Sequence, residues 1–180
     1  MDSTLSPVSR FDFVLLVLRL AVGLTLVAHG FNKVKGGLAG VARWFEGIGV
    51  RPGRLHAPLA ATTEMAGGAG VALGLVTPLA AAGIIGVMVV ASIAAHARNG
   101  FFIFRPGEGW EYTFMLAIAC FLIATIGPGR WSLDNAIGVI DHGYLGSWWG
   151  AFIALVVGAG SGLLVLVTCW RPPAREPKAA

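Results

Sequence analysis

The chain has 180 residues, of which 56% are hydrophobic and only 12% are charged, and its formal net charge is +4. Together with a mean hydropathy of +0.77, this composition excludes an ordinary water-soluble domain and indicates a single integral membrane domain. The cations lie in polar segments beside apolar stretches rather than in a basic stripe, so nucleic acid is not expected as a partner.

Five apolar stretches predict an all-α membrane protein with five membrane-spanning helices. They are Phe11 to Phe31, residues 57–77, Pro78 to about His96, Trp110 to Ile126, and Trp148 to Trp170. About 20 residues of helix, at roughly 1.5 Å each, cover a hydrocarbon core of about 30 Å. Because Pro78 directly follows the second stretch, the second and third helices are expected to form a tight antiparallel hairpin.

The segments between these stretches predict short helices at the membrane surface. Residues 41–50 favour an interfacial or re-entrant helix, because four apolar side chains fall on one helical side: Val41, Trp44, Phe45 and Ile48. The sequence G-P-G-R at residues 127–130 is expected to end the fourth span. Residues 131–147 are too polar to cross a membrane, and Ser132 or Asp134 is expected to cap a short surface helix there.

The distribution of cations predicts the orientation of the chain. Five spans place the two ends on opposite sides of the membrane. The side of the N-terminus carries two cations, Arg10 and Arg130, the other side carries ten, and Arg19 lies inside the first span. Cytoplasmic segments of membrane proteins are enriched in Lys and Arg, so we expect the N-terminus outside and the C-terminus in the cytoplasm.

Glu64 is the only charged residue in the second predicted span. A charge at the centre of a membrane helix costs about 2.5–3.5 kcal/mol on insertion scales, so this carboxyl group should be neutral, paired or turned toward a polar cavity. Gly67, Gly68 and Val71 fall on the same helical side. Small residues let membrane helices approach closely, so this span is expected to contact partners on more than one side.

Four polar side chains fall in the predicted cytoplasmic half of the bundle: His29, Glu64, His96 and Glu111. Arg19 lies deeper, with its cation in reach of Glu64, of Asp12 or of solvent. Two interpretations stay open. Either these groups line a small polar cavity that handles protons or holds the head of a quinone-like molecule, or they are helix-end residues around an Arg19–Glu64 ion pair that fixes helix register. For Glu64 the functional interpretation is favoured.

Other chemistries find less support in the sequence. Two histidines on different helices could bind a haem iron from both sides. The residues along their helices allow such a site but do not indicate one, so haem is disfavoured. No ligand pair at i and i+4 indicates a metal site, and neither a phosphate-binding glycine loop nor a G-x-S-x-G motif is present. Cys120 and Cys169 form no C-x-x-C pair, which disfavours a thiol relay. The sequence therefore leaves open whether the chain is an enzyme.

Several short motifs occur in a familiar order along the chain. They are L-R-L-A-V-G-L at 18–24, A-H-G-F-N-K at 28–33, T-E-M-A-G-G-A-G-V-A-L-G-L-V-T-P at 63–78, a histidine closing the third span, and G-P-G-R-W-S-L-D at 127–134. In these motifs the chain resembles the DoxX family of bacterial membrane proteins, over about residues 14–135. The recurring motif positions are Arg19, His29, Lys33, Glu64 and Asp134.

The resemblance implies a domain plan and a class of function. It implies a DoxX-like four-helix transmembrane bundle over residues 1–135, a surface segment and a fifth, additional transmembrane helix over 136–170, and a disordered basic cytoplasmic tail over 171–180. Members of the family are membrane subunits of oxidoreductase assemblies linked to quinones or to oxidative stress. The resemblance thus implies a bacterial cytoplasmic (inner) membrane location, contact with lipid, and other membrane or membrane-associated subunits as partners.

The leading hypothesis from the sequence is an accessory subunit of a redox assembly, which is not itself required to be catalytic. Its candidate polar pocket comprises Glu64, His29, Arg19, Lys33, His96 and Glu111, with a quinone as a compatible ligand and no metal. The alternative is a non-catalytic membrane scaffold or assembly factor that recruits partner proteins through the Gly158/Gly162 face or the basic tail. A small-molecule transporter is disfavoured, because the chain shows no inverted repeat.

Overall fold

The computed structural model describes residues 7–138 and 148–173, and within these ranges the chain is helical and contains no β-strand. Three segments depart from the α-helix: the π-helical turns η1 and η4 and the short 3-10 turn η2. The described elements are α1 (Pro7–Lys35), α2 (Leu38–Gly47), α3 (Gly53–Leu73), α4 (Thr77–Val90), η1 (Ala91–His96), η2 (Ala97–Asn99), α5 (Glu111–Ile126), α6 (Leu133–Ala136), α7 (Trp148–Ile153), η4 (Ala154–Ala159) and α8 (Gly160–Cys169).

Three continuous helical segments of the described chain are long and apolar enough to cross a membrane: Ser9–Lys35, Thr77–Asn99 and Trp148–Cys169. The fourth predicted span, α5, is apolar but shorter. Helix α3 has 21 residues, but Glu64 and its glycines lower its hydropathy. A less apolar helix is expected where neighbouring helices, rather than lipid, cover its surface.

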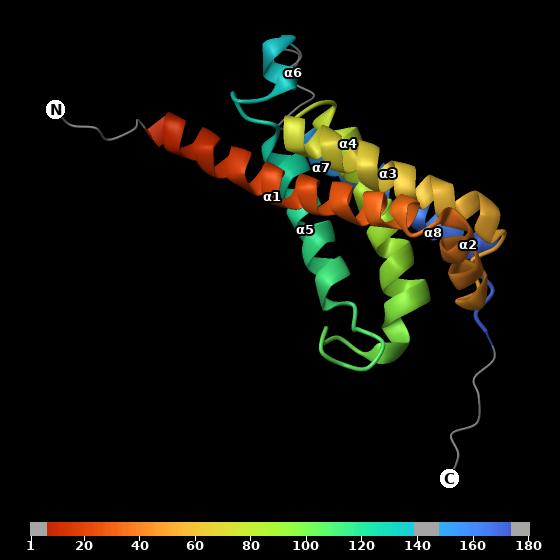
Figure 1. The fold of residues 1–180 in the computed structure, drawn as a ribbon. Coiled ribbons are helices and arrows are strands. Elements are labelled where there is room, and N and C mark those ends of the chain that lie inside the picture. Colours follow the sequence, from red (N-terminus) through yellow and green to blue (C-terminus); the bar gives the residue numbers. More distant parts are fainter. Residues whose placement is uncertain (1–6, 139–147, 174–180) are drawn as a thin grey trace.

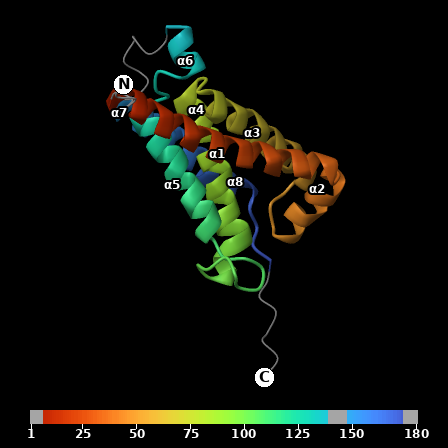
Figure 2. The same ribbon diagram turned by 60° about the vertical axis from the view of Figure 1, so that its left-hand side comes forward.

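The helices form two antiparallel pairs that share the turn between α3 and α4. Helix α1 packs along α3, and α5 packs along α4. Figures 1 and 2 show the two pairs close together near this turn and diverging toward α2 on one arm and toward the segment between η2 and α5 on the other. The last helical segment, α7 to α8, packs against α4.

Small residues permit the close approach of α1 and α3. A Cβ atom on Gly68 would lie 2.6 Å from the carbonyl oxygen of Gly23, and one on Gly23 would lie 2.4 Å from the carbonyl oxygen of Gly68. On the other side of α3, a Cβ on Gly67 would lie 3.1 Å from the carbonyl oxygen of Ala80 in α4. The expectation that this helix contacts partners on more than one side is confirmed.

Glycines also bring α4 and the last helical segment together. A Cβ on Gly158 would lie 2.9 Å from the carbonyl oxygen of Ala82, and one on Gly162 would lie 2.7 Å from that of Gly86. The sequence offered Gly158 and Gly162 as a face for a partner protein. The structure corrects this interpretation, because α4 of the same chain already occupies that face.

The turn between α3 and α4 is held by Asp134, which lies far away in the sequence. Its carboxylate accepts hydrogen bonds from Val76 N at 2.8 Å, Thr77 N at 3.1 Å and Thr77 Oγ1 at 2.8 Å. Asp134 therefore caps the start of α4, whereas Ser132 caps α6 by accepting from the backbone N–H of Asn135. Of the two predicted caps of the surface helix, Ser132 is the correct one.

This turn also corrects the predicted end of the second span. The expected helix ran to residue 77, but α3 ends at Leu73 and Thr77 already belongs to α4. Gly74 adopts a left-handed conformation with φ 64° at the end of α3, a common helix terminator. The bonds from Asp134 then fix the backbone that follows, so the new helix begins one residue before Pro78.

Arg19 lies at the same turn, with only 1% of its surface exposed. It donates a hydrogen bond to the carbonyl oxygen of Trp131, and a Cβ on Gly74 would lie 1.9 Å from its Nη1. None of the three partners expected for its cation is therefore found. Asp12 instead accepts a hydrogen bond from the backbone N–H of Arg130 at 2.9 Å. We refer to Arg19, Gly74, Thr77, Trp131 and Asp134 as the cap cluster.

Candidate functional site

A cavity of about 550 Å³ lies between the two arms and is bounded by α1, α2, α3, α4, η1, α5 and α8. Its wall is mostly apolar, with side chains such as Leu26, Phe45 and Met88. This volume and this composition are typical of sites that bind small organic molecules. The polar side chains in its wall are His29, Lys33, His56, Thr63, Glu64, His96, Glu108, Tyr112, Thr113 and Ser161.

Glu64 and Lys33 form an ion pair in the wall of this cavity. Glu64 is only 4% exposed, so the inward orientation predicted for it is confirmed. Its Oε2 atom contacts Lys33 Nζ, and Lys33 therefore takes the place that the sequence gave to Arg19. The Lys33 side chain is 22% exposed, so removing it would leave the buried Glu64 charge without compensation, which is costly in free energy. The two side chains come from α1 and α3, so the pair also connects these helices.

A second polar pair joins α1 to α5. Tyr112 Oη and His29 Nε2 lie 3.1 Å apart, and their ring centroids are 5.7 Å apart. Both side chains line the cavity. Sequence reasoning selected Glu111 and missed Tyr112, because it considered charge without the rotation of about 100° between neighbouring helical residues.

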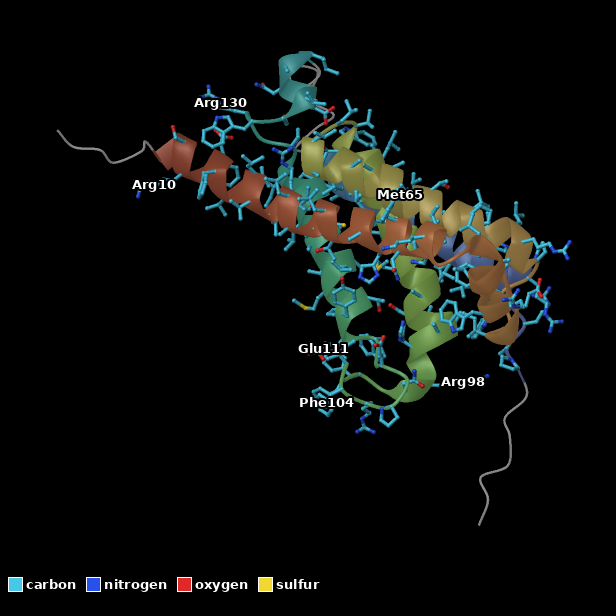
Figure 3. All side chains as sticks on the ribbon, viewed as in Figure 1. Arg10, Met65, Arg98, Phe104, Glu111 and Arg130 are labelled. Carbon is cyan, nitrogen blue, oxygen red and sulfur yellow. The ribbon has the colours of Figure 1, made fainter. Side chains whose placement is uncertain are left out.

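Glu111 does not line the cavity. Its carboxylate accepts a hydrogen bond from the backbone N–H of Ile103 at 3.1 Å. Figure 3 shows Glu111 at the start of α5, close to the connecting segment that carries Phe104. A carboxylate in the first turn of a helix is favourably placed, and this one also holds the preceding loop by a hydrogen bond, so its role is structural. The structure thus separates Glu111, like Arg19, from the other candidate residues.

His96 lines the cavity from the π-helical turn η1. Its Nδ1 atom lies 2.9 Å from the carbonyl oxygen of Glu108. Because a carbonyl oxygen only accepts, Nδ1 carries the proton in this contact and Nε2 is an acceptor in the neutral ring. His96 therefore ties η1 to the segment before α5 at one rim of the cavity.

His56 is a third histidine in the wall of the cavity, and sequence reasoning missed it. It lies near the start of α3, and its Nε2 atom is buried without a hydrogen-bond partner. The only available signal was its position eight residues, a little more than two helical turns, before Glu64. Although three histidines share one wall, no cluster of three or more His, Cys, Asp or Glu residues in the described ranges is placed to hold a metal ion.

Residues 14–97 match the family model DoxX. This segment is therefore a DoxX-family domain, and it makes up a little under half of the chain. No curated protein and no solved structure matches the chain. Together with the apolar helices, the DoxX segment makes this a membrane protein whose helices contact lipid.

The cavity combines the DoxX segment with later parts of the chain. The segment contributes the Glu64–Lys33 pair, whereas Tyr112 comes from α5 and Ser161 from α8, which both lie beyond residue 97. A second, more open hollow of about 450 Å³ lies at the turn between α1 and α2. It shares Lys33 and Trp44 with the cavity. Lys33 of the DoxX segment therefore borders both spaces.

Proposed function

We propose that this DoxX protein is an accessory membrane subunit of a redox assembly and binds an amphipathic molecule with a quinone-like head in its cavity. The observation that carries the proposal is the partly buried Glu64–Lys33 pair in the wall of a largely apolar cavity. Intramembrane ionisable residues are rare and costly, and they commonly mark ligand or proton sites. The proposed role is binding, and we assign electron transfer to other subunits of the assembly.

The chemistry of the wall suits such a head group. The carbonyl oxygens of a quinone need donors, which the ammonium group of Lys33 and the hydroxyl group of Tyr112 supply. The hydroxyl groups of a quinol need acceptors, which the carboxylate of Glu64 supplies. Apolar side chains around these groups suit a ring and a hydrocarbon tail. The wall therefore has partners for both oxidation states of one molecule.

We propose further that five helical segments cross a bacterial inner membrane, with the N-terminus outside and the cavity in the cytoplasmic half. The excess of cations on one side supports this orientation. Cysteines introduced as Arg10→Cys and Arg98→Cys, one in each variant, test it with a membrane-impermeant maleimide on intact cells. The expected result is labelling at position 10 only, and labelling at position 98 only would reverse the orientation.

Binding of decylubiquinone to the protein in lipid nanodiscs tests the proposed ligand class. Glu64→Gln should weaken binding about tenfold, because the neutral amide leaves the Lys33 ammonium uncompensated and removes the strongest acceptor. Lys33→Met should weaken it to a similar extent. Lys35→Met is the matched control, since Lys35 is an exposed lysine on the same helix, and it should leave the Kd unchanged.

The outcome that contradicts this proposal is also specific. If decylubiquinone binds wild type and Glu64→Gln with equal affinity, and only the thermal stability differs, the ion pair has a purely structural role. Failure of wild type to bind decylubiquinone at all would remove the ligand class itself.

A further inference from the structure

His56 is a polar group in the cavity that the chain itself leaves unsatisfied. Its Nε2 atom is buried and has no partner among the described residues. The neighbouring lining side chains from α2 are Trp44 and Phe45, and Val165 lines the cavity from α8. A buried polar atom without a hydrogen bond costs free energy. A bound molecule that supplies the missing hydrogen bond removes this cost. The cavity therefore offers a second polar contact besides the Glu64–Lys33 pair.

The two polar contacts, His56 and Glu64, lie at different positions along the axis of one helix, α3. His56 and Glu64 are eight residues apart, which corresponds to a rise of about 12 Å along α3. Leu59 and Ala60 line the cavity between them. Side chains of a helix lean in the same direction along its axis, so this rise is the separation of His56 and Glu64 measured along α3.

This separation matches a ring with an oxygen at each end. The two oxygens of a para-quinone are roughly 5 Å apart, and a hydrogen bond of about 2.8 Å at each end extends the span to about 11 Å. A neutral imidazole can present Nε2 as a donor to a quinone carbonyl or as an acceptor from a quinol hydroxyl, depending on its tautomer. His56 can thus serve either oxidation state without a change of charge.

We infer that the cavity recognises a ligand by two polar ends, one at the Glu64–Lys33 pair and the other at His56 Nε2. The ligand class is a para-quinone or para-quinol with an apolar tail, as opposed to an amphiphile with one polar head such as a fatty acid. This inference rests on the proposed function and deepens it. His56 selects for the second oxygen of the ring.

Two probes that differ by one carbonyl test this inference. They are 2-decyl-1,4-naphthoquinone and 2-decyl-1-tetralone, which lacks the second carbonyl group. Isothermal titration calorimetry with the full chain in nanodiscs gives the ratio of their Kd values. Wild type should bind the naphthoquinone about fivefold more tightly, the effect of one net hydrogen bond. His56→Phe and His56→Leu should bring the ratio close to one, and His56→Gln should restore part of the preference.

Arg54→Leu is the matched control. Arg54 is an exposed residue in the first turn of the same helix as His56, and it does not line the cavity. The probe ratio should therefore stay near fivefold in this variant. Because both probes are measured on the same protein, a loss of stability in one variant does not change the ratio.

Two failures are distinguishable. If the naphthoquinone binds but His56→Phe and His56→Leu keep the wild-type ratio, two-ended recognition through His56 is wrong while the proposed function stands. If wild type binds neither probe, the proposed function and this inference both fall.

Discussion

The cap cluster and the Glu64–Lys33 pair are two polar centres built in different ways. Each contains one buried charged residue from an apolar helix: Arg19 is 1% exposed and Glu64 is 4% exposed. In the cap cluster, the side chains bond mainly to backbone atoms of Val76, Thr77 and Trp131. The Glu64–Lys33 and Tyr112–His29 pairs instead join side chain to side chain in the wall of the cavity.

The comparison teaches how to distinguish a structural charge from a candidate binding charge in a membrane helix. A group bonded to the backbone fixes a turn, and it cannot change partner without releasing that turn. A group bonded to another side chain next to a cavity can exchange that partner for a ligand at a smaller cost. In the sequence, Arg19 and Glu64 look alike, because each is a lone charge in an apolar stretch. The identity of the partner atoms separates them.

The largest effect is expected from Asp134→Ala. This change removes the acceptor of three hydrogen bonds and leaves buried donors at the start of α4 unsatisfied. It also removes a carboxylate that interacts electrostatically with the buried Arg19. We expect a loss of about 3–5 kcal/mol in the free energy of unfolding, measured by denaturation in detergent micelles with circular dichroism.

Two variants sharpen this prediction. Asp134→Asn keeps the shape and one acceptor oxygen, so its loss should be smaller. Arg19→Met should cost only about 1–2 kcal/mol, because it removes one hydrogen bond together with two nitrogen atoms that have no partner. If Arg19→Met were as destabilising as Asp134→Ala, the cluster would depend on its cation rather than on the cap.

The smallest effect is expected from Tyr112→Phe in the cavity. The substitution removes one hydrogen bond to His29 at a site that is 36% exposed. Water can then replace the lost hydroxyl group, so the loss of stability should be below about 1 kcal/mol. The Kd for decylubiquinone, from the same nanodisc measurement, should rise about two- to fivefold.

A different result for Tyr112→Phe would break the comparison. A loss of stability as large as that of Asp134→Ala, with unchanged affinity, would show that the cavity pairs hold the helices together in the way the cap cluster does.

Much of the local structure could be predicted from the sequence, because it depends on neighbouring residues. The burial of Glu64 follows from the cost of a lone charge in an apolar helix. The cap by Ser132 follows from the polar residue before a short helix. The periodicity of apolar residues at 41–50 predicts the short helix α2, although the helix begins earlier, at Leu38, and ends at Gly47. In each case, the pattern that predicts the feature lies within one short stretch of the sequence.

The rest depends on contacts between distant segments. Asp134 caps a helix that begins 57 residues earlier, and no local pattern indicates that pairing. Arg19 was expected near Glu64, Asp12 or solvent, but its partner is the Trp131 carbonyl oxygen, which only the packed loop brings to it. His56 was missed for the same reason, since only the arrangement of the two helix pairs places it on the cavity.

The π-helical turn η1 changes which side of its helix reaches the cavity. Val87 and His96 both line it, yet nine residues at about 100° each would place them on opposite faces of a regular α-helix. A π turn contains an additional residue, which reduces the total rotation between Val87 and His96 by roughly 100°. The π turn therefore changes the direction in which the following side chains project, while the helix remains continuous. Without it, the imidazole at the rim would point away from the space that Val87 borders.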